Sequence, residues 1–255
     1  MISPIFVAHG SPTIVIEDNE YTRTLKEFGK SLKPKAIVVF TAHFEEETTT
    51  ISAIDDTYNM IYDFYGFPRE LYEMRYPAKG SVKIALKLQD MFNKKNIKSK
   101  LNTKRGLDHG AWTILKLMFP EANIPVVQVS VNQGLAIEEQ FKIGEAIQEL
   151  GNEDILVVGS GSTVHNLSEL KWEAEKPEKW PVEFDDWLID KVKSRDEKSL
   201  FQYRKLAPHA KLAVPRQEHL IPLFIAMGSS KNEELPKVLS RIYEYGTLSY
   251  ICLQF

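Results

Sequence analysis

Three short apolar segments of this chain each lead to a histidine within a few residues. The segments and their histidines are residues 5–8 with His9, residues 36–40 with His43, and residues 155–158 with His165. Short apolar runs that break on glycine or small polar residues are typical of buried strands in a parallel sheet. Open α/β sheets place their chemistry at the carboxyl ends of such strands. We therefore expect these histidines to converge on a single metal ion.

Amphipathic segments separate these strands. Apolar residues recur at helical spacing in residues 17–33, 81–93, 136–150 and 184–193. Ser81 is a suitable N-cap for the second of these helices. Residues 48–54, 98–101 and 125–131 have the composition of further strands. The pattern predicts an α/β protein: a single three-layer α/β/α domain, residues 1–255, with a mixed central sheet.

The C-terminal part of the chain contains two more helical patterns and one alternating segment. Apolar spacing predicts helices over residues 220–227 and 232–245. Residues 248–255 alternate between apolar and polar side chains, which is typical of an edge strand.

Composition excludes several classes of protein. The 255 residues carry a net charge of -3, so the chain lacks the basic surface that binds nucleic acid. No apolar run approaches the roughly 18 residues of a membrane span, and the first residues lack a signal-peptide pattern. We therefore expect a cytoplasmic protein with no nucleic-acid or membrane partner. The single cysteine, Cys252, excludes an internal disulfide and a cysteine-rich metal site, so any metal must be held by His, Asp or Glu.

Four residues are candidate metal ligands on this reasoning. His9 and His43 are the strongest, because strand ends hold imidazoles rigidly and imidazole nitrogen suits Zn(II) and Fe(II). Glu218 and His219 follow a proline and precede an apolar helix. Glu218 would complete a set of two histidines and one carboxylate, whereas His219 would complete a set of three histidines. A carboxylate at a helix start is also favoured by the helix dipole alone, so both readings stay open.

Two further histidines are candidates for acid–base catalysis. His165 and His109 both lie among glycines, and imidazole titrates near neutral pH. Asp108, beside His109, is equally suited to bonding its own backbone in a turn. The glycine-rich residues 159–162 lack the lysine and the spacing of a phosphate-binding loop. His209 has no partner pattern and is interpreted as a solvated loop residue.

An aromatic segment lies between the second strand and the next helix. Residues 58–77 contain seven aromatic side chains interrupted by glycine and proline, which indicates an irregular loop. Such a loop is suited either to forming the wall of a binding pocket or to covering the edge of the core.

Together these motifs resemble a known family. They occur in order along nearly the whole chain: HGSP at 9–12, TAHF at 41–44, YDFYGFP at 62–68, LDHGAW at 107–112, GSGS at 159–162 with VHN at 164–166, and PRQEH at 215–219. In combination they are similar to the class III extradiol ring-cleavage dioxygenases, specifically the 4,5-DOPA dioxygenase branch.

The resemblance implies roles for the histidines. His9, His43 and His219 match the family's metal ligands. His165 matches a histidine that acts as acid and base and is counted as a zinc ligand in some members. His109 matches a histidine that orients the substrate. The same motifs make Ser11, Tyr62 and Phe64 candidate substrate contacts.

The resemblance also implies a reaction. The substrates would be a small aromatic diol, such as DOPA, and O2, and the product would be a ring-opened semialdehyde. Fe(II) is expected for activity, although Zn(II) can occupy the same ligands in protein as isolated. This chain has Val214 where the family usually has a histidine before the proline. That departure falls at a substrate contact or at a residue that supports a ligand.

Two other functions are compatible with the same residues. Zinc on these ligands would activate water and support hydrolysis. A non-catalytic metal-binding protein on the same scaffold is the third possibility.

Overall fold

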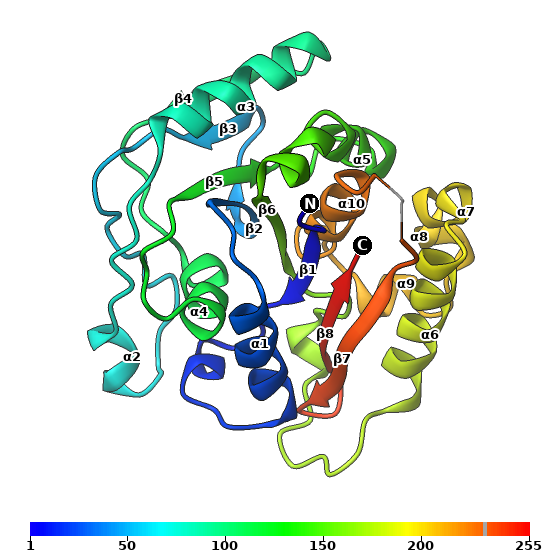
Figure 1. The fold of residues 1–255 in the computed structure, drawn as a ribbon. Helices are drawn as coiled ribbons and strands as arrows, with labels where there is room; N and C mark the ends of the chain where they lie inside the picture. The colour runs from blue at the N-terminus through cyan, green and yellow to red at the C-terminus, as the bar shows by residue number, and fades with distance from the viewer. Residues whose placement is uncertain (232–233) are drawn as a thin grey trace.

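An eight-stranded mixed sheet forms the centre of the molecule in a computed structural model, which describes residues 1–231 and 234–255 (Figure 1). The strands lie in the order β4-β3-β5-β2-β6-β1-β8-β7. Their bounds are β1 (Ile5–Ala8), β2 (Ala36–Glu45), β3 (Thr49–Ser52), β4 (Ser99–Asn102), β5 (Val126–Val131), β6 (Ile155–Gly161), β7 (Lys237–Glu244) and β8 (Leu248–Gln254).

The four central strands β5, β2, β6 and β1 run parallel to one another. β3 and β8 flank them in the antiparallel direction. The residues of β1, β5 and β6 are all buried, because helices cover both faces of the sheet. This is why these strands read as continuous apolar runs in the sequence.

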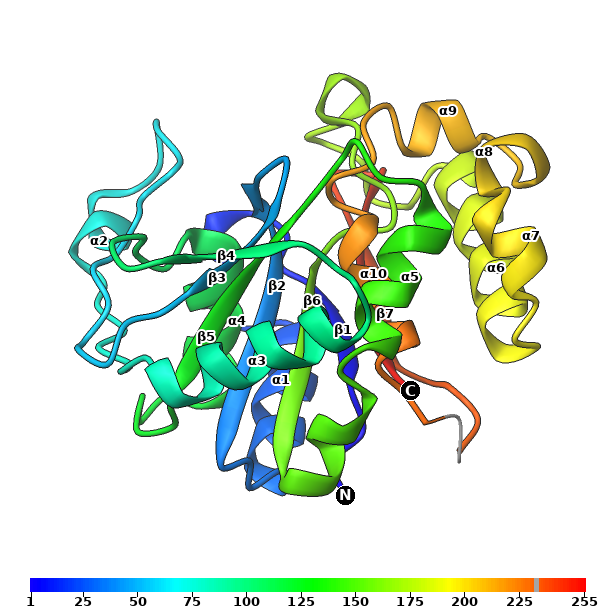
Figure 2. The ribbon, with the colours of Figure 1, turned by 90° about the horizontal axis from the view of Figure 1, so that it is seen from above.

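Helices form a layer on each face (Figures 1 and 2). α1 (Glu20–Ser31) and α4 (His109–Met118) cover one face, and α3 (Val82–Lys94), α5 (Ile137–Glu145) and α10 (Ile221–Gly228) cover the other. The remaining helices are α2 (Arg69–Glu73), α6 (Lys179–Lys193), α7 (Glu197–Phe201), α8 (Tyr203–Leu206) and α9 (Ala210–Ala213), with short 3-10 helices η1 (Pro12–Val15), η2 (Gln148–Glu153) and η3 (Leu167–Glu169). The predicted three-layer α/β/α fold with a mixed sheet is confirmed.

Two helix starts follow from local side-chain bonds. The Ser81 side chain accepts a hydrogen bond from the Ile84 backbone and caps α3, as predicted. The Asp108 side chain accepts from the Ala111 backbone and caps α4. α4 therefore begins at His109, so His109 belongs to the first turn of a helix and not to a loop.

The prediction of a helix over residues 232–245 is wrong. Residues 232 and 233 lie outside the described part of the chain, and 237–244 form strand β7. β7 pairs with β8 through a tight turn in which Tyr245 and Gly246 both have positive φ, 51° and 71°. Glu244 pairs with Leu248, so the turn consists of residues 245–247. β8 is consequently not an edge strand, because it lies between β1 and β7.

Among the residues that the structure describes, no helix combines the length and the apolar character needed to cross a membrane.

Candidate metal centre

Three adjacent strands bring the predicted histidines together. β6 lies between β1 and β2, and all three run in the same direction. His9 follows β1 directly, and His165 follows β6 after three residues. His43 lies within β2, since this strand continues past the predicted end at residue 40 to Glu45. His219 lies two residues before α10.

Two glycines permit the close approach of these elements. A Cβ at Gly161, the last residue of β6, would lie 2.0 Å from the backbone oxygen of His219. Only glycine at this position therefore lets the segment that carries His219 pack against β6. The Ser162 backbone donates to the same oxygen at 2.8 Å. A Cβ at Gly110 would lie within 3.2 Å of His9 Nδ1, so the first turn of α4 also packs directly on the histidines.

The side chains of His9, His43 and His219 converge on one point. One ligand atom from each lies within 4.8 Å of the others. The Nε2 atoms of His9 and His43 are 3.1 Å apart. His9 and His219 are almost fully buried, with exposed fractions of 1% and 6%, whereas the His43 side chain is 23% exposed.

Hydrogen bonds fix the tautomers of the first two imidazoles. His43 Nδ1 lies 3.0 Å from an oxygen of Asp63, and a carboxylate can only accept, so Nδ1 carries the proton. His9 Nδ1 lies 2.9 Å from Ser160 Oγ, whose own proton is donated to the Gly110 carbonyl. His9 therefore donates from Nδ1. When both imidazoles are neutral, their Nε2 atoms are left with lone pairs that face each other.

The third imidazole has the same arrangement. His219 Nδ1 lies 3.0 Å from Glu218 Oε1 and donates to it. His219 Nε2 is buried and has no hydrogen-bond partner among the described residues. Three unprotonated nitrogens thus face one point, a costly arrangement unless a cation binds between them.

The residues fit a divalent metal ion. Nitrogens that share one ion at its usual bond length lie about 2.9–3.4 Å apart, and the His9–His43 separation falls within this range. Three neutral imidazoles are a ligand set for Zn(II) or Fe(II). Burial, and then repulsion from neighbouring histidines, holds the pKa of His9 and of His219 well below the ordinary value, so both are neutral near pH 7.

Asp63 connects the metal centre to His109. Its other oxygen lies 2.8 Å from His109 Nδ1 and also accepts from the His109 backbone at 3.1 Å. Burial alone would raise the pKa of Asp63, but the hydrogen bonds from His109 and His43 hold it well below the ordinary value. One carboxylate therefore orients two imidazoles, whose ring centroids are 4.1 Å apart.

His165 stacks on His219, with ring centroids 3.5 Å apart and ring planes inclined by 9°. Its side chain groups with Glu218 and His219 and not with His9 and His43. Burial lowers the pKa of His165 to about 4, although the charge of Glu218 acts in the opposite direction. His165 is therefore neutral near pH 7 and can accept a proton. Its predicted role as a fourth metal ligand stays a prediction.

The three predicted substrate contacts differ in how directly they touch the histidine cluster. The Phe64 ring meets the His109 ring edge-on at 5.7 Å and so borders the centre directly. Tyr62 packs behind it against Trp112, and its hydroxyl donates to the Met74 carbonyl. Ser11 caps η1, and its backbone donates to the Tyr250 hydroxyl. The aromatic loop therefore covers the core edge and also reaches the site.

Sequence reasoning missed the supporting side chains Asp63 and Ser160, and it considered Glu218 only as a candidate ligand. Asp63, Ser160 and Glu218 each fix the Nδ1 proton of one histidine. Metal-binding histidines usually have such a partner, but the sequence does not show which residue provides it. His209, as predicted, lies outside the site, where it pairs with Glu183.

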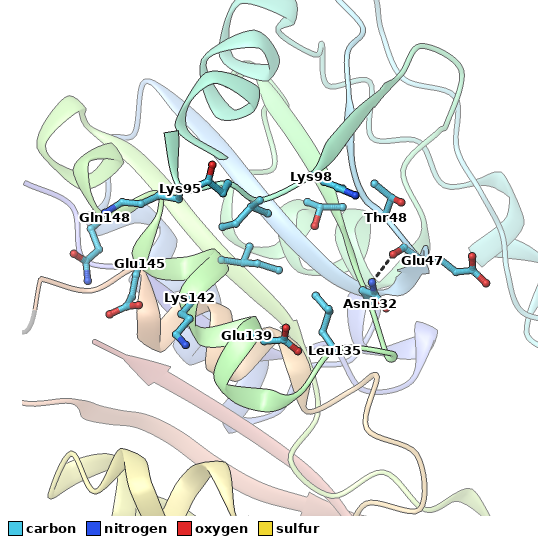
Figure 3. A pocket seen from close by; sticks show the side chains of 14 residues that line it. Glu47, Thr48, Lys95, Lys98, Asn132, Leu135, Glu139, Lys142, Glu145 and Gln148 are labelled. Atoms are coloured by element: carbon cyan, nitrogen blue, oxygen red, sulfur yellow. Dashed lines mark hydrogen bonds between the residues drawn. The ribbon is translucent and has the colours of Figure 1, made fainter. Parts of the chain in front are cut away.

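A cavity of about 690 Å³ lies elsewhere, between α3 and α5 (Figure 3). Its rim carries charges of both signs: Lys95, Lys98, Lys142, Glu47, Glu139 and Glu145. No histidine lines this cavity, so it is separate from the metal centre.

Residues 3–253 match the family model described as the catalytic LigB subunit of aromatic ring-opening dioxygenase. The chain belongs to this family. The family's description is that of an aromatic ring-opening dioxygenase, so the predicted extradiol dioxygenase resemblance is confirmed at the level of the family. The family is one of non-haem, metal-dependent dioxygenases, and the histidine cluster described above could hold such a metal.

Named relatives cover nearly the whole chain. The 4,5-DOPA dioxygenase extradiol of Beta vulgaris is 37% identical over 98% of this chain and 95% of its own length. A protein of the same name from Escherichia coli K12 is 34% identical over 98% of this chain and 93% of its own. A crystal structure of an uncharacterised E. coli K12 protein superposes with a TM-score of 0.85 at 30% identity, covering 100% of both chains.

Proposed function

We propose that this chain is a metal-dependent extradiol dioxygenase that opens the ring of a DOPA-like catechol with O2. The bond beside the diol breaks, and both oxygen atoms of O2 enter the semialdehyde product. The observation that carries the proposal is the convergence of three imidazole nitrogens on one point, with the His165 ring stacked on that of His219.

We assign His9, His43 and His219 as the residues that hold the metal, and Fe(II) as the active ion. Fe(II) on three neutral ligands would lower the pKa of a catechol hydroxyl and provide the redox chemistry that O2 requires. Zn(II) fits the same nitrogens without that redox chemistry. Glu218 supports His219 from its far side and is not a ligand in this assignment.

His165 moves the proton. Because its pKa is lowered to about 4, it is neutral at pH 7 and accepts the second hydroxyl proton of the catechol. It then returns this proton as the ring opens. Its position against His219 keeps the imidazole beside the metal centre throughout.

His109 and the aromatic loop orient the ring. With Nδ1 bonded to Asp63, the His109 imidazole has Nε2 left for a substrate oxygen. Phe64, edge-on to His109, provides an apolar wall for a flat ring. Tyr62 packs edge-on against Phe64. Ser11, two residues after the ligand His9, is the third substrate contact that we propose.

The decisive experiment is O2 uptake by protein reconstituted anaerobically with Fe(II), using L-DOPA and a panel of other catechols. We expect uptake and a yellow ring-opened product. His165→Ala should retain the metal but lose about 10²–10⁴-fold in rate. His209→Ala is the matched control, because it removes a histidine from a surface ion pair and should leave the rate unchanged.

Absence of O2 uptake with every catechol, in protein shown to contain Fe(II), would overturn the proposal. If the Fe(II) protein consumes no O2 but the Zn(II)-loaded protein hydrolyses a substrate, the alternative function of a zinc-dependent hydrolase is favoured. Metal binding without either activity would favour a binding protein.

A further inference from the structure

The loop that carries His165 is bound to strand β8 by side-chain hydroxyls. Ser162 Oγ lies 2.9 Å from the Val164 carbonyl and 3.1 Å from the Ser249 carbonyl. Thr163 Oγ1 donates to Ser249 Oγ at 3.0 Å. All of these groups are buried, so none exchanges its partner for water.

These bonds lead to a buried carboxyl group that the proposed reaction does not use. Ser249 Oγ donates to Asp185 Oδ2 at 2.6 Å, and the Tyr243 hydroxyl donates to the same oxygen at 2.8 Å. Asp185 lies on α6, far from the histidine motifs in sequence, and its exposed fraction is 0%. Burial raises its pKa, while the bonds from Ser249, Thr163 and Tyr243 act the other way.

The hydroxyl chain has one direction. Since Ser249 gives its single proton to Asp185, its oxygen must accept the proton of Thr163. Turning Thr163 away would leave a buried hydroxyl without a hydrogen-bond partner, which is unfavourable. The loop backbone between Gly161 and His165 is therefore held in one position.

The far end of the loop is fixed independently. The His165 backbone donates to the Ala213 carbonyl at 3.0 Å, and its ring stacks on His219. With its two ends fixed, the loop leaves the His165 imidazole little freedom to move from the metal centre.

We propose that Asp185 is a positioning residue: acting through Ser249 and Thr163, it holds the loop that places His165 against His219. This inference rests on the proposed acid–base role of His165. A displacement of about 1 Å at a catalytic group can lower the rate about a hundredfold, so such support bears directly on kcat.

Thr163 provides a matched pair of variants. Thr163→Val removes the hydroxyl at nearly constant size, whereas Thr163→Ser keeps it. We expect Thr163→Val to lose about 10–100-fold in kcat with unchanged KM and metal content, and Thr163→Ser to restore most of the rate. Equal losses in both variants would show that the methyl packing matters and would overturn the proposal.

A readout without metal or turnover makes the test independent of the dioxygenase assignment. In metal-free protein labelled with ¹³C-histidine, the His165 signal is identified by its loss in His165→Ala. The ring of His219 shifts this signal, so we expect it to move in Thr163→Val and in Ser249→Ala but not in Thr163→Ser. An unmoved signal in the first two variants would also overturn the proposal.

Asp185 itself is tested by Asp185→Leu, which removes the acceptor, with Asp190→Asn on the exposed side of α6 as the control. We expect Asp185→Leu to reproduce the His165 shift of Ser249→Ala. If Asp185→Leu does not fold, Thr163→Val still separates the carboxyl group from the loop, because the Thr163 hydroxyl bonds Ser249 and also acts on Asp185. If wild-type protein consumes no O2 but the shifts appear, the proposed function fails and the positioning role of Asp185 stands.

Discussion

The imidazoles of His165 and His219 lie face to face, with centroids 3.5 Å apart and planes 9° from parallel. One is assigned to move a proton and the other to hold the metal. Two neutral rings can stack this closely, whereas two imidazolium ions would repel each other. The lowered pKa of both groups, caused first by burial, keeps them neutral at pH 7.

Separate substitutions of Glu218 and His219, the two candidate third ligands, should identify the one that binds the metal. His219→Ala removes a nitrogen donor, and we expect Zn(II) affinity to fall by more than about a hundredfold. Glu218→Gln keeps an oxygen that accepts from His219 Nδ1, so we expect a loss of about tenfold. Isothermal titration calorimetry measures both. A greater loss in Glu218→Gln would mean that the carboxylate is the ligand.

Metal binding should weaken as the pH falls below neutral. Burial lowers the pKa of His43, but the hydrogen bond that His43 donates to Asp63 and nearby negative charges outweigh this and raise the pKa above its ordinary value. Metal binds only the neutral imidazole, so protons compete below that pKa, with affinity falling about tenfold per pH unit. Above that pKa the competition disappears.

The carboxylate of Asp63 determines the pH at which metal affinity begins to fall, because it raises the pKa of His43. In Asp63→Asn the pKa of His43 should fall, so the loss of affinity should begin at a lower pH, while affinity at pH 8 falls by about 10–100-fold. Asp90→Asn, which alters an exposed ion pair on α3, is the control. An unchanged pH profile in Asp63→Asn would contradict the assigned hydrogen bond.

Phe64 should affect substrate binding more than the chemical step. Phe64→Ala removes the ring beside His109, and we expect KM for a catechol to rise about tenfold with a smaller change in kcat. The neighbouring Tyr65 is 92% exposed, so Tyr65→Ala should leave KM unchanged. Steady-state kinetics distinguishes these outcomes. An unchanged KM in Phe64→Ala would show that the Phe64 ring does not line the substrate pocket.

Gly161 should be intolerant of any side chain. Gly161→Ala would place a methyl group 2.0 Å from the His219 backbone oxygen, so either β6 or the ligand segment must move. We expect a loss of about 1–3 kcal/mol or more in unfolding free energy. Gly134→Ala on the surface should change it by no more than about 0.5 kcal/mol. Urea denaturation compares the two, and equal stability of both variants would contradict the close approach.

The apolar and polar pattern of the sequence predicted the strands and two of the three histidines that meet at the centre. Apolar runs ending at His9, His43 and His165 predict parallel strands, because only strands buried on both faces are apolar throughout. Parallel strands present their carboxyl ends at one edge, so these three histidines were expected to converge on one ion. His9 and His43 do converge, with His219 as the third member, whereas His165 stacks on His219 and groups with Glu218 instead.

Local patterns failed where tertiary pairing decides. Residues 237–244 repeat apolar side chains at a spacing that suits a helix, yet they pair with β8 as a strand. The turn at Tyr245 and Gly246 and the neighbouring strand provide backbone partners that the helical pattern does not reveal.

The orientation of the imidazoles depends on contacts that form only in the folded chain. Asp63 and Ser160 fix the protons of His43 and His9 from distant segments, whereas Glu218 adjoins His219 in the chain. Asp185 reaches the His165 loop from α6 through a residue of β8. Hydrogen bonds between distant segments leave no periodic signal in a sequence, because they depend on where folded elements cross and not on what lies beside them in the chain.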